Sequence, residues 1–547
     1  MNTIGFKNFR KFTDFPPISL DGINIFVGGN NSGKSTVVKA MLLIDNFIKN
    51  ASKQNVFARP YFVFGGASSI GTFSRALCNK GNNEEIYFES VLDYYLIKLW
   101  IRQEKKQPNS SNAVISKISI IDVEHNIEIV YDFLDKQQID VDFFPGKEAK
   151  DSMKKQLNSI REGEEELLSE IAQLELEIEK QKKLLSARAK ESKNALDKTV
   201  EGIDLLQKLA SRNERLKEMK IKGLQNQNTV YELEKLLQPI KLPLGFYDNH
   251  SNMLYIKQLV LNIVAARNYL AVNKENANYN EELFKKELIE KRVDDFQDFA
   301  DGLEKAAEKN RIEYIYAHAA DQVALYDSRD ENDYVAKSIR EFVNSQIGKN
   351  DEEWQFVREW MKLFEIGNDF QIESYFGEAY GLSIIDESKR QINLADKGKG
   401  SIQLTILLLR LATIIRKYNI GKDNIIVLVE EPEQNIHPDL QVLLTDLFCD
   451  VYKRWGIRFI VETHSEYLVR HAQFIVAGKK YKHEQESIDR NPFKVYYFRQ
   501  DNVPYDMILE DTGLFKNSFG NGFFNVAALE ALGLSKIERE RKNKRDE

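Results

Sequence analysis

The pattern of apolar positions predicts an α/β domain at the two ends of the chain. The run Ile23–Val27 predicts a buried strand, which is followed by a glycine-rich loop and a helix from Ser35. Ile425–Val429 and Arg458–Val461 predict two more buried strands, separated by one helix length as in a parallel sheet. Between about residues 85 and 134, β-rich stretches alternate with polar turns and indicate an antiparallel subdomain.

A heptad pattern begins after Pro145 and Gly146. Its first seam comprises Met153, Leu157, Ile160, Glu164, Leu167, Ile171, Leu174, Ile178, Gln181 and Leu185. A weaker seam comprises Leu196, Val200, Ile203, Leu209, Leu216 and Leu233. We predict an antiparallel coiled-coil hairpin that reverses between Ser186 and Asn194, with arms of about 55 Å. A solvated helix pair that only packs within a bundle is the alternative.

The coiled coil is therefore expected to interrupt one α/β domain. Periodicity over Glu281–Leu303 and Tyr334–Val343 further predicts a mostly helical region whose role the sequence does not indicate. The expected units are 1–145 and 370–500 for the two parts of the head, 146–240 for the hairpin, 241–369 for the helical region and 501–547 for the tail.

Composition narrows the class of protein. With 547 residues, 42% of them hydrophobic and 29% charged, the chain is expected to be soluble and multidomain. No apolar run is long enough for a membrane span and the N-terminus lacks a signal-peptide pattern, so we expect a cytoplasmic protein without membrane contact. Cys78 and Cys449 are too few for a Cys-rich zinc site. The net charge of -7 means that any nucleic acid would need a local basic patch.

A phosphate-binding motif lies between the first buried strand and its helix. The sequence from Gly28 to Thr36 matches G-x-x-x-x-G-K-[ST] in the required strand-to-helix context. Backbone N–H groups of the loop would surround phosphate oxygens, Lys34 would reach the β and γ phosphates of ATP, and Ser35 would ligate Mg²⁺. The expected ATP-binding residues are Asn30, Asn31, Ser32, Gly33, Lys34, Ser35 and Thr36.

Two carboxylates follow the strand Ile425–Val429. Glu430 and Glu431 would stand at the C-terminal edge of a parallel sheet, where such sheets bind ligands. We expect Glu430 to hold Mg²⁺ through water, and Glu431 to orient or deprotonate the attacking water. The alternative is an acidic turn without a metal.

The next strand leads into Glu462-Thr463-His464-Ser465. A neutral imidazole at His464 could sense the γ-phosphate, so this residue is a candidate catalytic group. A structural histidine is the alternative. The sequence therefore places a second candidate group one strand after the double glutamate.

A glycine-rich segment precedes the apolar helix that begins near Leu404. Gly398, Gly400, Ser401 and Gln403 would form a second anion site at the start of this helix. Because the phosphate loop of the same chain already fills one phosphate position, we expect this helix to cap the γ-phosphate bound to a neighbouring subunit. A glycine-rich turn without a ligand is the alternative.

Together these elements resemble the ABC-type ATPase domain of the AAA and OLD-like proteins, relatives of SMC and RecF-type ATPases. The resemblance covers about residues 1–135 and 370–500 and implies a head-to-head dimer with ATP and Mg²⁺ between subunits. The segments that carry it are Phe6–Phe12, which contains an N-F-R start, Glu430–Glu433 with His437 and Pro438, and Glu462–Ser465.

Three departures from that family stand out. Glu430 replaces the usual Asp, and the extra methylene predicts slow hydrolysis of ATP. Lys397–Gln403 is a loose version of the L-S-G-G-Q signature, and Phe64–Ser69 lacks the coupling glutamine. The last departure argues against a transporter subunit, whereas the presence of Glu431 argues against a purely structural coiled-coil protein.

The tail narrows the resemblance further. Only about 83 residues follow His464, which leaves little room for a Toprim domain, and they show no HNH pattern. The chain in this respect resembles the PtuA ATPases of Septu and retron anti-phage defence. That resemblance implies an HNH-type nuclease as partner and, in retron systems, a reverse transcriptase with its msDNA or ncRNA. An ATP-dependent DNA clamp of the RecF or SMC kind is the competing hypothesis.

Overall fold

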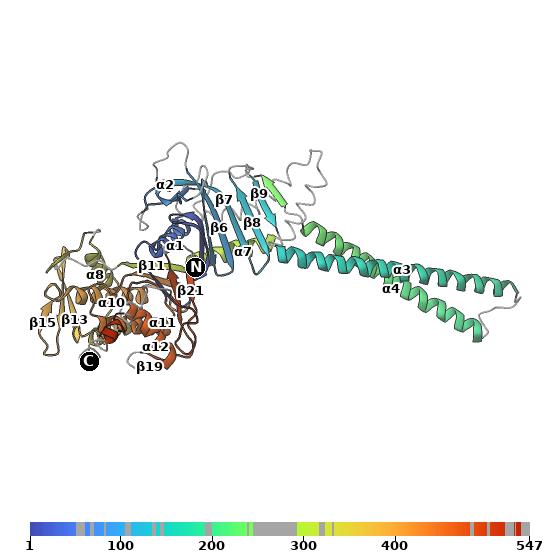
Figure 1. Ribbon diagram of the computed structural model, residues 1–547. Helices are drawn as coiled ribbons and strands as arrows, with labels where there is room; N and C mark the ends of the chain where they lie inside the picture. The colour runs from blue at the N-terminus through green and yellow to red at the C-terminus, as the bar shows by residue number, and fades with distance from the viewer. Residues whose placement is uncertain are drawn as a thin grey trace.

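The computed structural model describes most of the ATPase head and both arms of the hairpin. The described residues are 1–50, 61–65, 70–80, 84–103, 111–133, 138–142, 147–191, 200–237, 240–243, 293–316, 323–330, 333–481, 486–499, 504–519, 530 and 532–537. Two large sheets lie above one another in the head, and a pair of long helices projects from it (Figure 1).

The sheet that carries the predicted motifs has six strands, of which five are parallel. Its order is β11 (Asn310–Tyr316), β16 (Asn424–Glu430), β17 (Arg458–Glu462), β3 (Ile23–Gly28), β20 (Phe493–Phe498) and antiparallel β21 (Tyr505–Met507). Both faces are covered, which explains the continuous apolar runs of its strands. Phe26 and Leu428 face the second sheet, whereas Ile25 and Val427 pack against helices.

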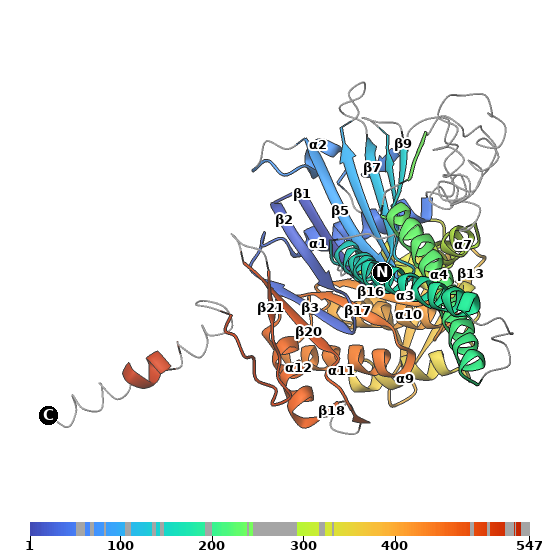
Figure 2. The same ribbon diagram turned by 90° about the vertical axis from the view of Figure 1, so that its right-hand side faces the viewer.

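The second sheet is antiparallel, as predicted, and includes the first two strands of the chain. Its order is β10 (Ile240–Pro243), β9 (Gln138–Asp142), β8 (Ile127–Asp132), β7 (Asn112–Asp122), β6 (Tyr95–Arg102), β5 (Glu85–Leu92), β1 (Thr3–Phe9) and β2 (Phe12–Ser19), with β4 (Tyr61–Val63) beside β7. Helix α1 (Lys34–Asn50) lies between the two sheets, and α7 (Val293–Lys309) adds to the same core (Figures 1 and 2).

Helices cover the other face of the parallel sheet. They are α8 (Tyr334–Asn344), α9 (Glu352–Leu363), α10 (Lys399–Lys417), α11 (Pro438–Trp455) and α12 (Glu466–Gly478). A small sheet of β12 (Tyr326–Asp327), β13 (Asp369–Tyr375), β14 (Ala379–Ile385) and β15 (Gln391–Asn393) lies at the far end of these helices. Minor elements are α2 (Phe73–Ala76), the 3-10 turn η4 (Leu394–Asp396), β18 (Lys480–Tyr481) and β19 (Glu486–Ser487).

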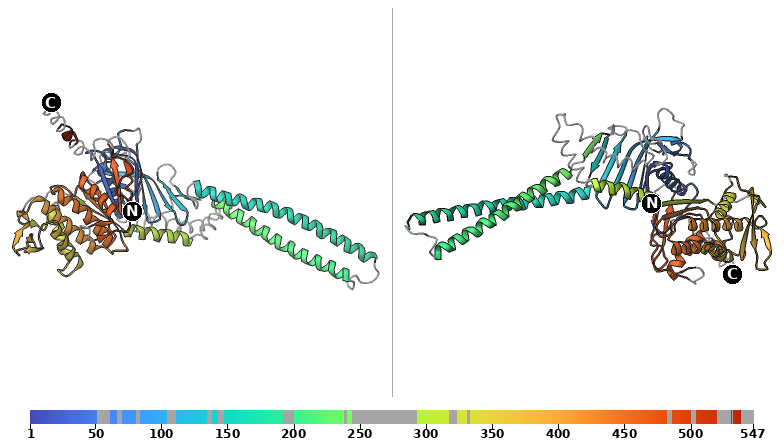
Figure 3. Two further views of the ribbon diagram at one scale, coloured as in Figure 1. Left: turned by 60° about the horizontal axis from the view of Figure 1, so that its bottom comes forward. Right: turned by 180° about the vertical axis from the view of Figure 1, so that it is seen from behind.

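The predicted hairpin consists of α3 (Lys147–Glu191) and α4 (Val200–Leu236), which pack against each other away from the head (Figure 3). Every residue of the first predicted seam is at least partly buried, including the two polar ones. In the second seam Ile203 is 45% exposed and Leu205 lies inward in its place. Helix α3 continues past Ser186 to Glu191, and the rest of the segment in which the reversal was predicted, residues 192–194, lies outside the described ranges.

Strands β11 and β21 of the parallel sheet were not among the predictions. Helices α7, α8 and α9 fit the expectation of a mostly helical region 241–369, and Asn310–Tyr316 within it forms β11 at the edge of the sheet. The tail likewise contributes β21 to that sheet through pairs such as Val495 with Met507. Residues 281–292 of the predicted helix Glu281–Leu303 lie outside the described ranges, and its remainder begins α7.

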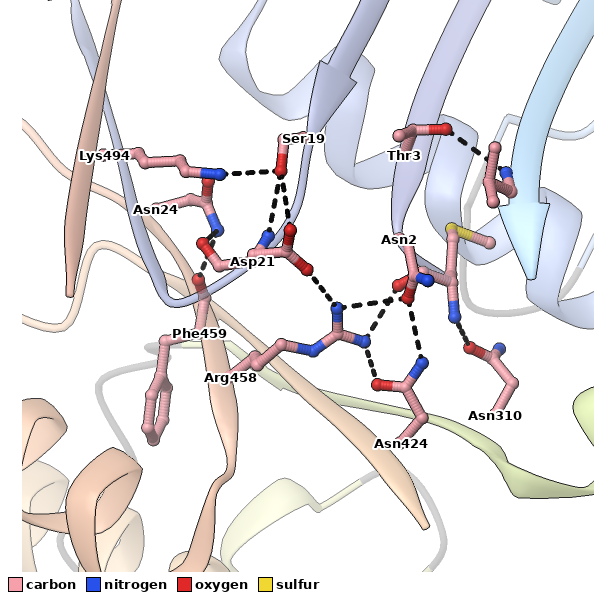
Figure 4. Close-up of polar contacts among 12 residues, drawn as sticks. Asn2, Thr3, Ser19, Asp21, Asn24, Asn310, Asn424, Arg458, Phe459 and Lys494 are labelled. Carbon is pink, nitrogen blue, oxygen red and sulfur yellow. Dashed lines mark hydrogen bonds and ion pairs between the residues drawn. The ribbon is translucent and has the colours of Figure 1, made fainter. Parts of the chain in front are cut away.

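A polar network joins the two sheets at the N-terminal ends of β16 and β17 (Figure 4). The Arg458 guanidinium donates to the carbonyl of Met1 at 2.9 Å and to Asp21 at 3.2 Å, and it also reaches Asn2 and Asn424. A buried guanidinium requires such partners, because its charge has been removed from water. The network therefore fixes the first strand of the chain against the parallel sheet, at the edge opposite the predicted phosphate site.

Candidate nucleotide-binding site

The predicted phosphate loop connects β3 to α1 as expected. Gly33 adopts a φ of +109°, and a side chain there would approach the ring of Phe12 to within 2.5 Å. Only glycine fits this backbone. The Lys11 ammonium donates to the carbonyl of Asn31 at 2.9 Å, so the turn between β1 and β2 holds the loop from outside. The glycine backbone and the Lys11 contact thus define the position of the loop that should surround phosphate.

Lys34 is buried at the base of this loop. Its ammonium donates to the carbonyls of Gly28 and Gly29 at 3.0 and 3.2 Å, and lies 3.1 Å from Nε2 of His464. Burial lowers the pKa of Lys34, while Glu462 and Glu431 oppose this effect. These contacts show that Lys34 and His464, which are 430 positions apart in the sequence, belong to one site.

His464 follows β17, and its environment favours a neutral ring. Burial lowers the pKa of His464, and the charge of Lys34 lowers it further. In a neutral ring, Nε2 accepts a hydrogen bond from the Lys34 ammonium, and the ring proton is then on Nδ1. The backbone N–H of His464 donates to Glu433 at 2.7 Å and fixes the loop. A neutral imidazole therefore lies beside the phosphate-loop lysine, and sensing of the γ-phosphate by His464 stays a prediction.

Glu431 lies on the open side of the site. Its carboxylate is 3.7 Å from Nε2 of His464, accepts a hydrogen bond from Gln434, and remains 36% exposed. Its backbone has a φ of +43°, which is uncommon for a residue with a side chain, and its N–H donates to the carbonyl of Glu462 at 2.7 Å. The chain therefore presents Glu431 toward solvent beside His464, where an attacking water could be oriented.

Glu430 and Glu462 are paired in register on the neighbouring strands β16 and β17. Glu430 accepts a hydrogen bond from Tyr314 of β11; burial and then this bond raise the pKa of the tyrosine. Ser35, the predicted Mg²⁺ ligand, donates to Glu462 at 2.7 Å. Burial raises the pKa of Glu462 to about 7, and Glu430 contributes to the increase.

Glu462 and Tyr314 were not among the predicted site residues. Glu462 could have been found from the strand ends, because it closes β17 as Glu430 closes β16 and adjacent parallel strands end at one edge. Tyr314 could not have been found in this way, because β11 itself was not predicted.

Three cations, Arg10, Lys39 and Arg75, lie close enough to influence one another. Burial lowers the pKa of Lys39, and Glu430 and Glu462 oppose the change.

The predicted signature residues do not all behave alike. Gly398 is the exposed N-cap of α10, and Ser401 is partly exposed in its first turn. A side chain at Gly400 would approach the carbonyl oxygen of Asn435 to within 2.4 Å. Gln403 is only 9% exposed and donates to the carbonyl of Pro432 at 3.0 Å in its own chain. Gln403 thus holds α10 against the segment after Glu431, and its action on a neighbouring subunit stays a prediction.

The donor set fits ATP with Mg²⁺. Ser32 has a buried hydroxyl without a hydrogen-bond partner among the described residues, and it stands within the phosphate loop. No group of three or more His, Cys, Asp or Glu side chains is placed to hold a metal in the described part of the chain. Mg²⁺ does not need one, because it binds through one or two carboxylates together with phosphates and waters. Ser35, Glu430 and Glu462 are the oxygen donors that could hold it, and the ion would neutralise phosphate charge.

A phosphate loop, two strand-end carboxylates and a following histidine define an ATPase site of the ABC type. The chain belongs to the AAA ATPase domain family, whose model matches residues 1–469. It is an ATPase of that family with an α/β head. A comparison with curated proteins gave no match.

Solved structures with a similar arrangement include SMC head domains. One from Pyrococcus furiosus, with an extended coiled coil and bound to the C-terminal domain of ScpA, is 10% identical and has a TM-score of 0.30. That alignment covers 92% of this chain and 95% of the other. The SMC head domain from Thermotoga maritima is 9% identical over 93% and 98% of the two chains, with a TM-score of 0.31.

In the described part of the chain, no helix combines the length and apolar content that crossing a bilayer requires.

Proposed function

We propose that this ATPase is the regulatory subunit of an anti-phage defence system of the PtuA type. Two heads would sandwich ATP and Mg²⁺, and the closed dimer or a higher oligomer would control a partner nuclease of the HNH type. The observation that carries the ATP-dependent part is the meeting of Lys34, Ser35, Glu431 and His464 at one edge of the parallel sheet. Nucleotide would then bias a two-state element, the open or closed pair of heads.

The start of α10 supports a shared site. Gly398 is exposed there and provides no side-chain cap, so the first N–H groups of the helix can receive an anion. Gln403 and Gly400 fix this helix start beside residues 431–436 of the same chain. A γ-phosphate bound to a second copy is the ligand proposed for Gly398, Gly400 and Ser401.

The α3–α4 hairpin is the proposed docking element for the partners. Its two helices are joined by ion pairs such as Glu175 with Lys220 and Glu177 with Arg212, while most of its surface is exposed. An HNH nuclease, and in a retron system a reverse transcriptase with its msDNA or ncRNA, are the partners that the likeness to PtuA suggests. No nuclease centre of its own is assigned to the chain in this proposal.

Phage challenge tests the proposed role. Cells that carry the gene with its neighbouring genes are expected to resist phages, and resistance should be lost in Lys34→Ala and Glu431→Gln variants. Purification of the wild-type complex should recover a nuclease with the ATPase. Asp439→Asn, which changes a carboxylate that is 91% exposed on α11, is the matched control and should protect like wild type. Equal protection by all four proteins would contradict the proposal.

A DNA clamp related to RecF and SMC proteins is the second candidate. It is favoured by exposed Lys180, Lys182 and Lys183 toward the distal end of α3, although Lys183 also pairs with Glu179. A clamp would bind duplex DNA in an ATP-dependent way, and its affinity would fall steeply with salt. DNA binding that persists without any partner protein, together with absence of phage resistance, would favour this second function.

A further inference from the structure

The carboxylate of Glu462 is held at the point where the phosphate loop meets the strand ends. Its Oε1 accepts a hydrogen bond from the Ser35 hydroxyl, with 2.7 Å between the two oxygens, and Glu462 is only 3% exposed. A serine hydroxyl has one proton and two lone pairs. Because the hydroxyl of Ser35 donates its hydrogen bond to Glu462, both lone pairs on the hydroxyl oxygen remain available to bind a cation. Glu462 therefore orients the hydroxyl as a metal ligand requires.

The second oxygen of the same carboxylate lacks a hydrogen-bond partner among the described residues. This oxygen, Oε2 of Glu462, is buried. A buried, unpartnered carboxylate oxygen costs free energy, and such atoms in native proteins call for a water, an ion or a functional reason. A water bound to Mg²⁺ would donate a hydrogen bond to this oxygen.

The neighbouring carboxylate, that of Glu430, has a different hydrogen-bond partner. Glu430 stands opposite Glu462 in the strand register, yet it accepts a hydrogen bond from Tyr314 on the far side, on β11. Two adjacent carboxylates repel each other unless a cation lies between them. Mg²⁺ commonly uses one or two carboxylates plus phosphate oxygens, and this pair beside Ser35 supplies them.

We propose that Glu462 is a second strand-borne carboxylate of the Mg²⁺ site, which orients Ser35 through one oxygen and accepts a metal-bound water through the other. This inference rests on the proposed binding of MgATP. Glu430 keeps its predicted role at the same ion, and Glu462 shares the neutralisation of the metal charge. The alternative is a structural role, in which Glu462 only fixes the phosphate loop through Ser35.

Glu462→Gln separates the two roles, because the amide oxygen can still accept from Ser35 while the negative charge is removed. Binding of a fluorescent ATP analogue would be measured in EDTA and during titration with Mg²⁺. We expect nucleotide affinity in EDTA to stay within about twofold, whereas the apparent Mg²⁺ affinity of the nucleotide complex falls by roughly 10- to 100-fold. Glu466→Gln, on the adjacent helix α12, is the control and should resemble wild type.

Three outcomes would overturn the assignment. Unchanged Mg²⁺ affinity would remove Glu462 from the metal site, and an equal loss in EDTA and in Mg²⁺ would show a purely structural role. Wild-type protein that binds no nucleotide under either condition would contradict the proposed ATP site, and this inference with it. Thermal melting reports folding of each variant. If Glu462→Gln does not fold, Glu462→Asp, which keeps the charge but withdraws it by one methylene, should show the same selective loss of Mg²⁺ affinity.

Discussion

Glu431→Gln is expected to slow ATP hydrolysis by roughly 10²- to 10⁴-fold while ATP binding is preserved. Glu431 is 3.7 Å from Nε2 of His464 and partly open to solvent, whereas Lys34 and Ser35 hold the proposed phosphate and metal positions. Glutamine keeps the shape of the side chain and its contact with Gln434, but it cannot accept a proton from water. Phosphate release under single-turnover conditions measures the chemical step.

Asp439→Asn is again the matched control, because it removes a carboxylate from an exposed position a few residues away. Hydrolysis by this control should remain within about twofold of wild type, as for most exposed substitutions. A Glu431→Gln protein that hydrolyses ATP at the wild-type rate would show that another group orients the water. Loss of ATP binding in the same variant would instead show that Glu431 supports the nucleotide pocket.

Lys34→Ala is expected to weaken ATP binding by on the order of 100-fold, which corresponds to roughly 3 kcal/mol. The ammonium is buried against the carbonyls of Gly28 and Gly29, at the base of the loop that should surround phosphate. Its removal deletes the charge proposed to face the β and γ phosphates. Equilibrium titration with a fluorescent ATP analogue measures the loss.

Lys7→Ala tests whether any nearby lysine matters. Lys7 is exposed on β1, where it pairs only loosely with Asp14 at 3.4 Å. Its replacement should leave ATP affinity unchanged, because exposed ion pairs contribute little. Equal ATP affinity in wild type and Lys34→Ala would contradict the assignment of the phosphate loop.

The parts of the fold that the sequence predicted are those with local signals. Short stretches of sequence are enough to recognise each of three features. They are the phosphate loop, the apolar strands before Glu430 and Glu462, and the heptad seam of α3. Strand β11 was missed because Asn310–Tyr316 is only seven residues long and directly follows helix α7, without a glycine or proline to mark the boundary. Its strand partner, β16, lies more than 100 positions later, so no local pattern indicates the pairing.

Within the candidate site, the residues that belong to local motifs could be predicted, whereas contacts between distant segments could not. Lys34, Ser35 and His464 could be proposed from motifs, whereas the contact of Ser35 with Glu462 depends on the order of β16, β17 and β3 in the sheet. Gln403 shows a contact that the motif could not indicate. Helix α10 is buried along Ile402–Ile415, and the Gln403 amide donates to the carbonyl of Pro432 in its own chain.

The most direct test of the account is the mass of the Glu431→Gln protein, measured by light scattering with and without MgATP. Slow hydrolysis should keep ATP between two heads, because Lys34 and Ser35 of one chain and the start of α10 of the other would hold it together. We expect MgATP to raise the mass of Glu431→Gln to that of two chains or more, and Lys34→Ala to show no such change. A mass that is the same with and without MgATP in Glu431→Gln would contradict ATP-gated assembly.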